Sequence, residues 1–216
     1  ASIQVRSLEA NQEVWGQFYR GRLTYLTGKT EVQHFQYKDY ALEQFDLHTA
    51  LIRRDRGYQL QLTDLYIDAA KSKIDLPKIS LDLERQLGQV QPRKLMIDRV
   101  ELSSIAHWLL QQPFITSEVT DVLVSLSPVG VVENVTLDWP KGAEFNEFQL
   151  YADLLDVGIN AWDDVPEIKG INGLIEATKD SGKIHLVSND FAMKYPTLFD
   201  YRWTYPYAEG IVGWRF

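Results

Sequence analysis

The sequence predicts an α+β fold that is mostly β: a long antiparallel sheet with one short αα-hairpin inserted near its middle. Three observations predict this fold. Apolar and polar residues alternate over most of the chain, the apolar period becomes helical between Leu102 and Leu126, and glycines separate the alternating segments. Aromatic residues make up 12% of the chain, which agrees with a β-rich fold because flat side chains fit a pleated surface.

Most of the first hundred residues show the period of two that is typical of strands. Residues 58–68 alternate up to Thr63, and the alternation changes phase from Asp64 onward, which predicts either a β-bulge or a strand that meets water on different faces along its length. Residues 79–84 alternate without interruption. Four glycines between such segments are expected in hairpin turns: Gly21, Gly28, Gly57 and Gly88.

Two amphipathic helices are predicted after these strands. The first covers residues 102–112 and ends at Pro113, because its apolar residues recur three and four positions apart. The second can be capped by Thr116 or Ser117 and stops before Pro128. Two short helices joined by a few residues form an αα-hairpin.

Strands are expected again after the helical pair, up to the C-terminal residues 211–216, with a hairpin turn at residues 180–182. We treat residues 1–216 as one segment of a larger protein, because the chain starts without Met and ends on a strand-like pattern. Its parts are strands in 1–101, the helical hairpin in 102–128 and strands in 129–216.

The charge pattern argues against a nucleic-acid partner. The net charge is −8, whereas binding to phosphates needs a basic surface. Residues 1–100 hold 15 Lys and Arg against 13 Asp and Glu, and residues 101–216 hold 7 against 17, so the acidic excess belongs to the second half. The acidic half is interpreted as a solubility feature, with an acidic docking face as the alternative. No apolar run is long enough to cross a bilayer.

No motif in the sequence points to catalysis, a cofactor or a metal. Cysteine is absent, and the four histidines (His34, His48, His107 and His185) lack the spacing of metal ligands. The paired acids Asp163 and Asp164 are interpreted as a solvated turn. The segment 170–173 resembles a glycine loop but opens no helix, so we interpret it as a tight turn that leads into a strand. We therefore expect a protein that is not an enzyme.

The predicted strands carry more apolar surface than two short helices can cover. Either the sheet folds onto itself as a sandwich, or one apolar face stays open as a groove that can hold an acyl chain. The residue pattern by itself favours the sandwich.

Three segments resemble the large AsmA-like envelope proteins of Gram-negative bacteria, and among them the YhdP family. They are the helical pair that leads through residues 123–130 into a strand, the segment 148–159, and the turn-and-strand segment 165–177. In the third segment Glu167 stands where the family usually has a glycine, a departure that affects only a turn. The resemblance covers the second half well and the first half loosely.

The resemblance implies a curled, groove-like sheet in a bridge-type lipid carrier, which moves phospholipid between the inner and outer membranes. It implies a periplasmic segment whose parent protein is anchored in the inner membrane, with phospholipid acyl chains and neighbouring segments of the same parent chain as partners. The alternative is a structural or protein-interaction module of an envelope protein. The expected lipid-contacting residues are Phe148, Leu150, Ala152, Ile171, Ile175, Ile184 and Leu186.

Overall fold

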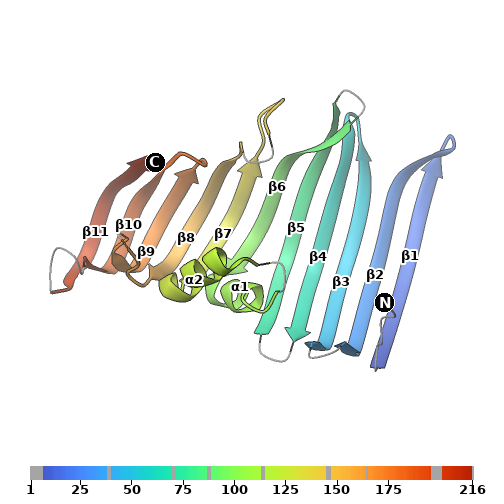
Figure 1. The fold of residues 1–216 in the computed structure, drawn as a ribbon. Coiled ribbons are helices and arrows are strands. Elements are labelled where there is room, and N and C mark those ends of the chain that lie inside the picture. The colour runs from blue at the N-terminus through green and yellow to red at the C-terminus, as the bar shows by residue number, and fades with distance from the viewer. Residues whose placement is uncertain are drawn as a thin grey trace. The chain divides into compact units, whose positions relative to one another are not determined.

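The computed structural model describes residues 7–37, 40–69, 72–86, 89–112, 115–144, 147–163, 165–195 and 201–215. These residues form eleven strands and two helices (Figure 1). In chain order they are β1 (Ser7–Tyr19), β2 (Arg22–Tyr37), β3 (Tyr40–Arg54), β4 (Gly57–Ala69), β5 (Ser72–Gln86), β6 (Gln89–Glu101), α1 (Leu102–Leu109), α2 (Ser117–Leu126), β7 (Val129–Asp138), β8 (Gln149–Ile159), β9 (Glu167–Ala177), β10 (Ser181–Lys194) and β11 (Trp203–Arg215).

The strands form one antiparallel sheet whose order follows the chain from β1 to β11. The prediction of a mostly β, antiparallel fold with a helical pair is therefore confirmed. The chain divides into two compact units: the first comprises residues 1–98 and 138–145, and the second comprises 99–137 and 146–216. No helix in the described part of the chain is long and apolar enough to span a membrane.

The first unit is built from successive hairpins. At the turn between β1 and β2, Arg20 and Gly21 both have positive φ (50° and 72°), as a two-residue hairpin turn with the right twist requires. The bulge predicted at Asp64 is confirmed: this residue has φ 54°, and the register of β3 with β4 shifts beside it. Gly28 was wrongly expected in a turn, since it lies inside β2. Gly88 lies outside the described residues.

The second unit has a hydrophobic core on one face of β8–β10. Its four buried residues are 6–8% exposed, and Leu102 at the start of α1 packs against them. The far end of the helical pair is attached as well, because the Asn160 amide donates a hydrogen bond to the Leu126 carbonyl at 2.8 Å. Part of this core is thus covered by the start of α1. Its buried residues are Leu154, Val157, Ile171 and Leu186.

Both helices lie where the period changes, with two differences from the prediction. The first helix ends at Leu109, before the predicted limit at residue 112. Thr116 occupies the N-cap position of α2, but its side chain makes no capping hydrogen bond. At the other end Ser127 adopts the left-handed conformation (φ 41°), which ends the helix before Pro128.

Residues with positive φ interrupt each of four neighbouring strands of the second unit. Asn134 on β7, Asp156 on β8, Gly170 on β9 and Asp190 on β10 all have positive φ. The segment 170–173 therefore lies in the middle of β9, and the interpretation as a turn leading into a strand was wrong. The pattern misled us because a glycine in a bulge and a glycine in a turn supply the same left-handed backbone conformation.

Candidate functional site

One face of the first unit carries a row of leucines that crosses five neighbouring strands. The strand registers place Leu26 of β2 opposite Leu51 of β3, Leu51 opposite Leu60 of β4, and Leu60 opposite Leu81 of β5. Leu81 in turn pairs with Leu95 of β6. Directly paired residues point to the same face of a sheet, so these five side chains form one line perpendicular to the strands. We call this line the leucine row.

A second line of paired residues lies beside the leucine row and extends the apolar surface. On β4, β5 and β6 it consists of Leu62, Ile79 and Ile97, which are in register with one another. On β3 and β2 it continues through Thr49 and Gly28. Together the two lines form an apolar surface across β2–β6, and we call it the leucine face.

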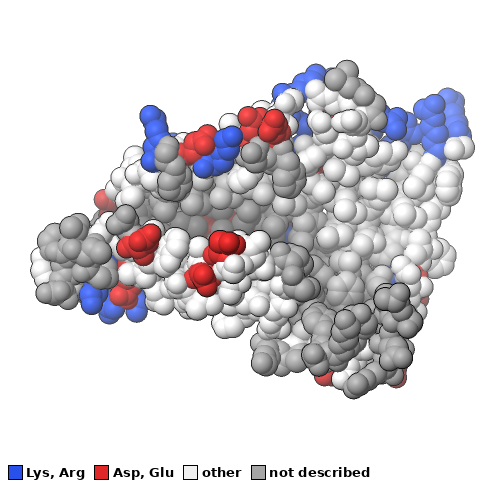
Figure 2. All heavy atoms as spheres, viewed as in Figure 1, with Lys and Arg blue, Asp and Glu red and all other residues white. Residues whose placement is uncertain are grey.

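The opposite face of the same strands is polar. There Gln59 of β4 donates a hydrogen bond to Asp82 of β5 at 2.8 Å, and Lys94 of β6 is in register with Asp82. Figure 2 shows the other side of these strands, where the surface over β2–β5 is almost free of charged atoms. The first unit is therefore a two-faced sheet, apolar on one side and charged on the other.

The leucine face differs from the core of the second unit in how far it is buried. All five members of the leucine row are half-buried, as are Leu62, Ile79 and Ile97. By contrast, Leu154 and Ile171 of the second unit are each only 6% exposed. The first unit contains no helix among its described residues that could pack on its strands. Its apolar face thus keeps accessible surface that an apolar ligand can cover.

Six of the seven predicted lipid-contacting residues lie on β8, β9 and β10 of the second unit, and Phe148 lies just before β8. Ala152, Ile175 and Ile184 are paired across β8, β9 and β10 and share a face. Ile171 and Leu186 belong to the core beneath α1, and Ala152 is buried as well, at 6% exposed. The remaining four are half-buried: Phe148, Leu150, Ile175 and Ile184. Lipid contact at the seven positions stays a prediction.

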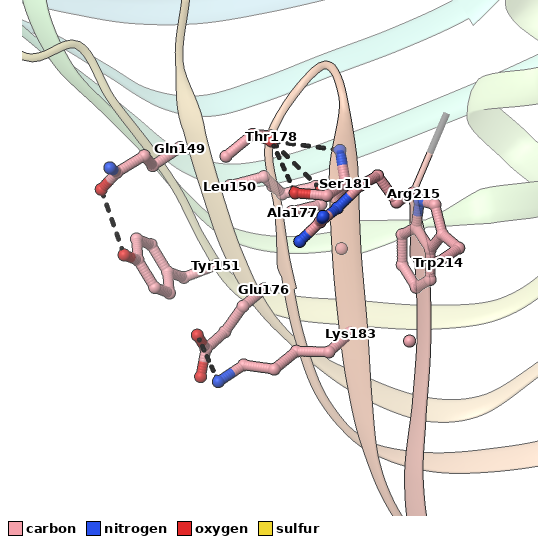
Figure 3. Close-up of a pocket in the computed structure, with 12 residues that line it drawn as sticks. Gln149, Leu150, Tyr151, Glu176, Ala177, Thr178, Ser181, Lys183, Trp214 and Arg215 are labelled. Carbon is pink, nitrogen blue, oxygen red and sulfur yellow. Dashed lines mark hydrogen bonds and ion pairs between the residues drawn. The ribbon is translucent and has the colours of Figure 1, made fainter.

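An open depression of about 570 Å³ lies at the end of this face, around the hairpin between β9 and β10 (Figure 3). Leu150 contributes to it, together with Trp214, whose indole lies over the backbone of Gly182. Its polar groups already pair with each other, since Lys183 contacts Glu176 at 3.1 Å. The depression offers a partly apolar wall and no reactive group.

No arrangement suited to catalysis appears among the described residues. They contain no group of three or more His, Asp or Glu side chains that could hold a metal ion. His48 lies 3.0 Å from Asp64, but both side chains are exposed on the surface. The pKa of Glu167 is lowered, chiefly by its hydrogen bond with Arg202 at 2.6 Å, and this pair joins β9 to the start of β11. These contacts are structural.

Comparison with known proteins supplies the family. The sequence model of the family described as YhdP protein matches residues 4–215, which is nearly the whole chain. This chain belongs to the YhdP family. No curated protein and no solved structure matches it. YhdP proteins are envelope proteins and do not form an enzyme family. The resemblance inferred from the second half therefore extends over the first half, where the leucine face lies.

Sequence reasoning missed the leucine face. The alternation in residues 58–62 and 79–84 predicted which residues of one strand share a face. It did not show that leucines of different strands align, because alignment depends on the register of each hairpin. One signal was present: leucines recur within the alternating segments of the first hundred residues, among them residues 58–68 and 79–84.

Proposed function

We propose that this chain is a segment of an AsmA-like lipid carrier, and that phospholipid acyl chains lie along its leucine face. The observation that carries the proposal is the line of paired, half-buried leucines from Leu26 to Leu95. Family membership supports an envelope protein, for which a lipid is a fitting apolar ligand. The carrier moves phospholipid between the inner and outer membranes.

The dimensions of the leucine row suit one acyl chain. Neighbouring strands lie about 4.8 Å apart, so a row across five strands spans roughly 19 Å. An acyl chain in one leaflet occupies about 15 Å, which is half of the bilayer's hydrocarbon thickness. Each methylene that leaves water contributes about 0.8 kcal/mol, so a chain can be held without any specific polar contact. A row perpendicular to the strands also allows a chain to slide from strand to strand.

The second unit contributes less to lipid contact in this proposal. Ala152, Ile171 and Leu186 are buried, at 6–8% exposed, so a lipid reaches them only if the side chains that cover them move. The half-buried members of the predicted set, among them Phe148 and Leu150, are accessible without such a movement. We propose these as secondary contacts, near the depression in Figure 3.

The proposal also states where the segment works in the cell and that it catalyses no reaction. The segment works in the periplasm as part of a parent protein anchored in the inner membrane, and it continues into neighbouring segments of that chain. It is not an enzyme, since transport along an apolar face needs shape and no reactive group. Family membership supports both statements.

Site-specific photo-crosslinking tests the proposal. A photoreactive amino acid replaces Leu60 on the leucine face, or Gln61 on the polar face of the same strand as a matched control. The protein is expressed in a Gram-negative host, irradiated and analysed by mass spectrometry for attached phospholipid. We expect lipid adducts at position 60 and none at position 61. Equal labelling at both positions, or none at position 60, contradicts the proposal.

Two substitutions on β4 provide a second test of lipid binding on the leucine face. Leu60→Glu places a charge on the leucine face, and we expect the amount of co-purified phospholipid to fall by about tenfold, because a buried charge costs several kcal/mol against an acyl chain. Gln61→Glu adds the same charge on the other face and should leave the lipid content unchanged. Circular dichroism of both variants checks that the sheet is intact.

A protein-interaction module is the second candidate function, and β1 favours it. This strand lies at the end of the strand order, where an edge can accept another strand. Trp15, Phe18 and Tyr19 on it are 63–72% exposed, which is unusual for large aromatic residues. If crosslinkers at Trp15 capture protein while position 60 captures no lipid, this second function is the better description.

A further inference from the structure

Arginines are concentrated at one end of the first unit. Of the eleven arginines in the sequence, seven lie in the turns that join β1 to β2, β3 to β4 and β5 to β6, or within five residues of these turns. In an antiparallel meander these three turns lie at the same end of the strands. Figure 2 shows Lys and Arg atoms gathered there, along the upper edge of the surface. The seven are Arg20, Arg22, Arg53, Arg54, Arg56, Arg85 and Arg93.

Four of these arginines line a pocket of about 300 Å³ at the turn between β3 and β4. The backbone fixes its shape, because the Arg85 amide donates a hydrogen bond to the Arg56 carbonyl at 2.9 Å and so ties the turn to the end of β5. We call this cavity the arginine pocket. Its lining residues are Arg53, Arg54, Asp55, Arg56, Gly57, Tyr58, Glu84 and Arg85.

The positive charge of the arginine pocket is largely uncompensated. Arg53, Arg56 and Arg85 are exposed, and their side chains have no hydrogen bond or ion pair within the described part of the chain. Glu84 already pairs with Arg93 outside the pocket lining, at 3.3 Å. Asp55 is thus the one lining carboxylate without an ion pair among the described residues. Exposed guanidinium groups at this density favour an anion with several oxygens, such as a phosphate.

The arginine pocket adjoins the leucine face. Tyr58 lines the pocket and is two residues from Leu60 on β4, so both side chains point to the same side of the sheet. Its partner on β5 is Leu83, two residues from Leu81. A ligand with an anionic head and an apolar tail can therefore place the head among the arginines and the tail on the leucine row.

We propose that the arginine pocket binds the phosphate of an anionic phospholipid headgroup whose acyl chains lie on the leucine face. This inference rests on the proposed function and deepens it, because it names the headgroup class. A zwitterionic headgroup also carries an ammonium group, for which the pocket offers only Asp55 against four guanidinium groups. The pocket thus selects lipids with net negative charge, and lipids enter or leave the face at this end.

Binding to vesicles of defined composition tests the inference. We compare phosphatidylglycerol with phosphatidylcholine of the same chain length by measuring transfer of a fluorescent acyl-chain analogue of each lipid from vesicles to the protein. The pocket variant is Arg56→Gln/Arg85→Gln. Its control is Lys78→Gln/Lys179→Gln, which removes two exposed cations with no ion pair among the described residues and outside the pocket. Inorganic phosphate serves as a competitor without an acyl chain.

We expect the unaltered chain to take up phosphatidylglycerol about tenfold better than phosphatidylcholine, and the pocket variant to lose this preference. The control should keep it. A factor of ten corresponds to about one charge-assisted hydrogen bond. Raised salt should reduce the preference in the unaltered chain, since the arginines are exposed.

The outcomes separate this inference from the proposed function. If both lipids are taken up to the same extent, the proposed headgroup selection is wrong. The proposed binding of acyl chains on the leucine face then still holds. Phosphate that competes at micromolar concentration shows a site for free anions and overturns the lipid assignment of the pocket. If neither lipid is taken up by the unaltered chain, the proposed function itself fails.

Discussion

At the scale of single residues, two buried serines show how hydrogen bonding decides stability in this sheet. Ser188 on β10 is fully buried, accepts a hydrogen bond from the Asn172 amide at 2.8 Å and donates to the Asn172 carbonyl at 3.2 Å. It thereby completes the ladder where the bulges interrupt it. Ser80 on β5 is 3% exposed, and its hydroxyl has no partner among the described residues.

The same substitution at the two serines should have opposite effects. Ser188→Ala leaves backbone groups of Asn172 unpaired, and we expect the free energy of unfolding to fall by about 1–3 kcal/mol. Ser80→Ala removes an unpaired hydroxyl and should raise it by up to about 1 kcal/mol. Urea unfolding followed by circular dichroism measures both. Equal effects of the two substitutions would show that burial alone, and not pairing, determines the result.

The ion pair between Glu167 and Arg202 predicts a dependence of stability on pH. The Glu167 side chain is 16% exposed, and its hydrogen bond with Arg202 lowers its pKa below the ordinary value of 4.5. A lowered pKa in the folded chain stabilises the fold above pH 4.5, and the stabilisation is lost as the pH falls through the folded pKa.

We therefore expect Glu167→Gln to cost about 1 kcal/mol at pH 7, a value reduced from that of a buried pair because Arg202 is 45% exposed. The difference from the unaltered chain should shrink as the pH falls through the lowered pKa of the folded chain, since Glu167 then becomes protonated in both the folded and unfolded chains. Urea titrations between pH 3 and pH 7 test this, with Arg202→Gln as the partner variant. A cost that persists at pH 3 would assign the effect to packing.

At the scale of elements, the strands depend on close backbone contacts at particular glycines. In β9, Gly173 has φ +150°, and a Cβ there would lie 2.0 Å from the His185 carbonyl oxygen on β10. Gly210 on β11 has open space around its Cβ position and no positive φ. The two glycines face the same residue of β10, because both pair with Leu186.

Gly173→Ala should destabilise the second unit by about 2 kcal/mol or more, because the new methyl group forces β9 and β10 apart and strains the backbone. Gly210→Ala should change stability by less than about 0.5 kcal/mol. The midpoint of urea unfolding of each variant provides the test. Similar midpoints for the two variants would mean that β10 adjusts to the methyl group.

At the scale of the whole molecule, the core of the second unit and the leucine face of the first unit differ in how far their apolar residues are buried. In the second unit Leu102 of α1 packs against the core, whereas the leucine face of the first unit is only half-buried. A protein gains free energy by burying apolar area, so an apolar face left accessible points to a ligand or a partner. The proposed binding of acyl chains at Leu60 and of headgroups at Arg56 follows from this difference.

Local features were predictable from sequence to the extent that they depend on neighbouring residues. The bulge at Asp64 and the helix end before Pro128 follow from side-chain alternation and backbone preferences. The segment 170–173 was misread, because its glycines serve a bulge in the middle of β9 and only the strand pairing reveals this. Three of the predicted site residues, Ala152, Ile175 and Ile184, share a face. The packing of Leu102 against the core that contains Ile171 and Leu186 depends on where α1 lies.

The sequence by itself determined that the chain is mostly β with one helical pair, and it showed no catalytic motif, because residue types and periods are local properties. Only the tertiary structure decided that leucines of five strands align in one row beside an arginine pocket. That alignment depends on the register of each hairpin, and one residue of slip would turn a strand's side chains to the opposite face.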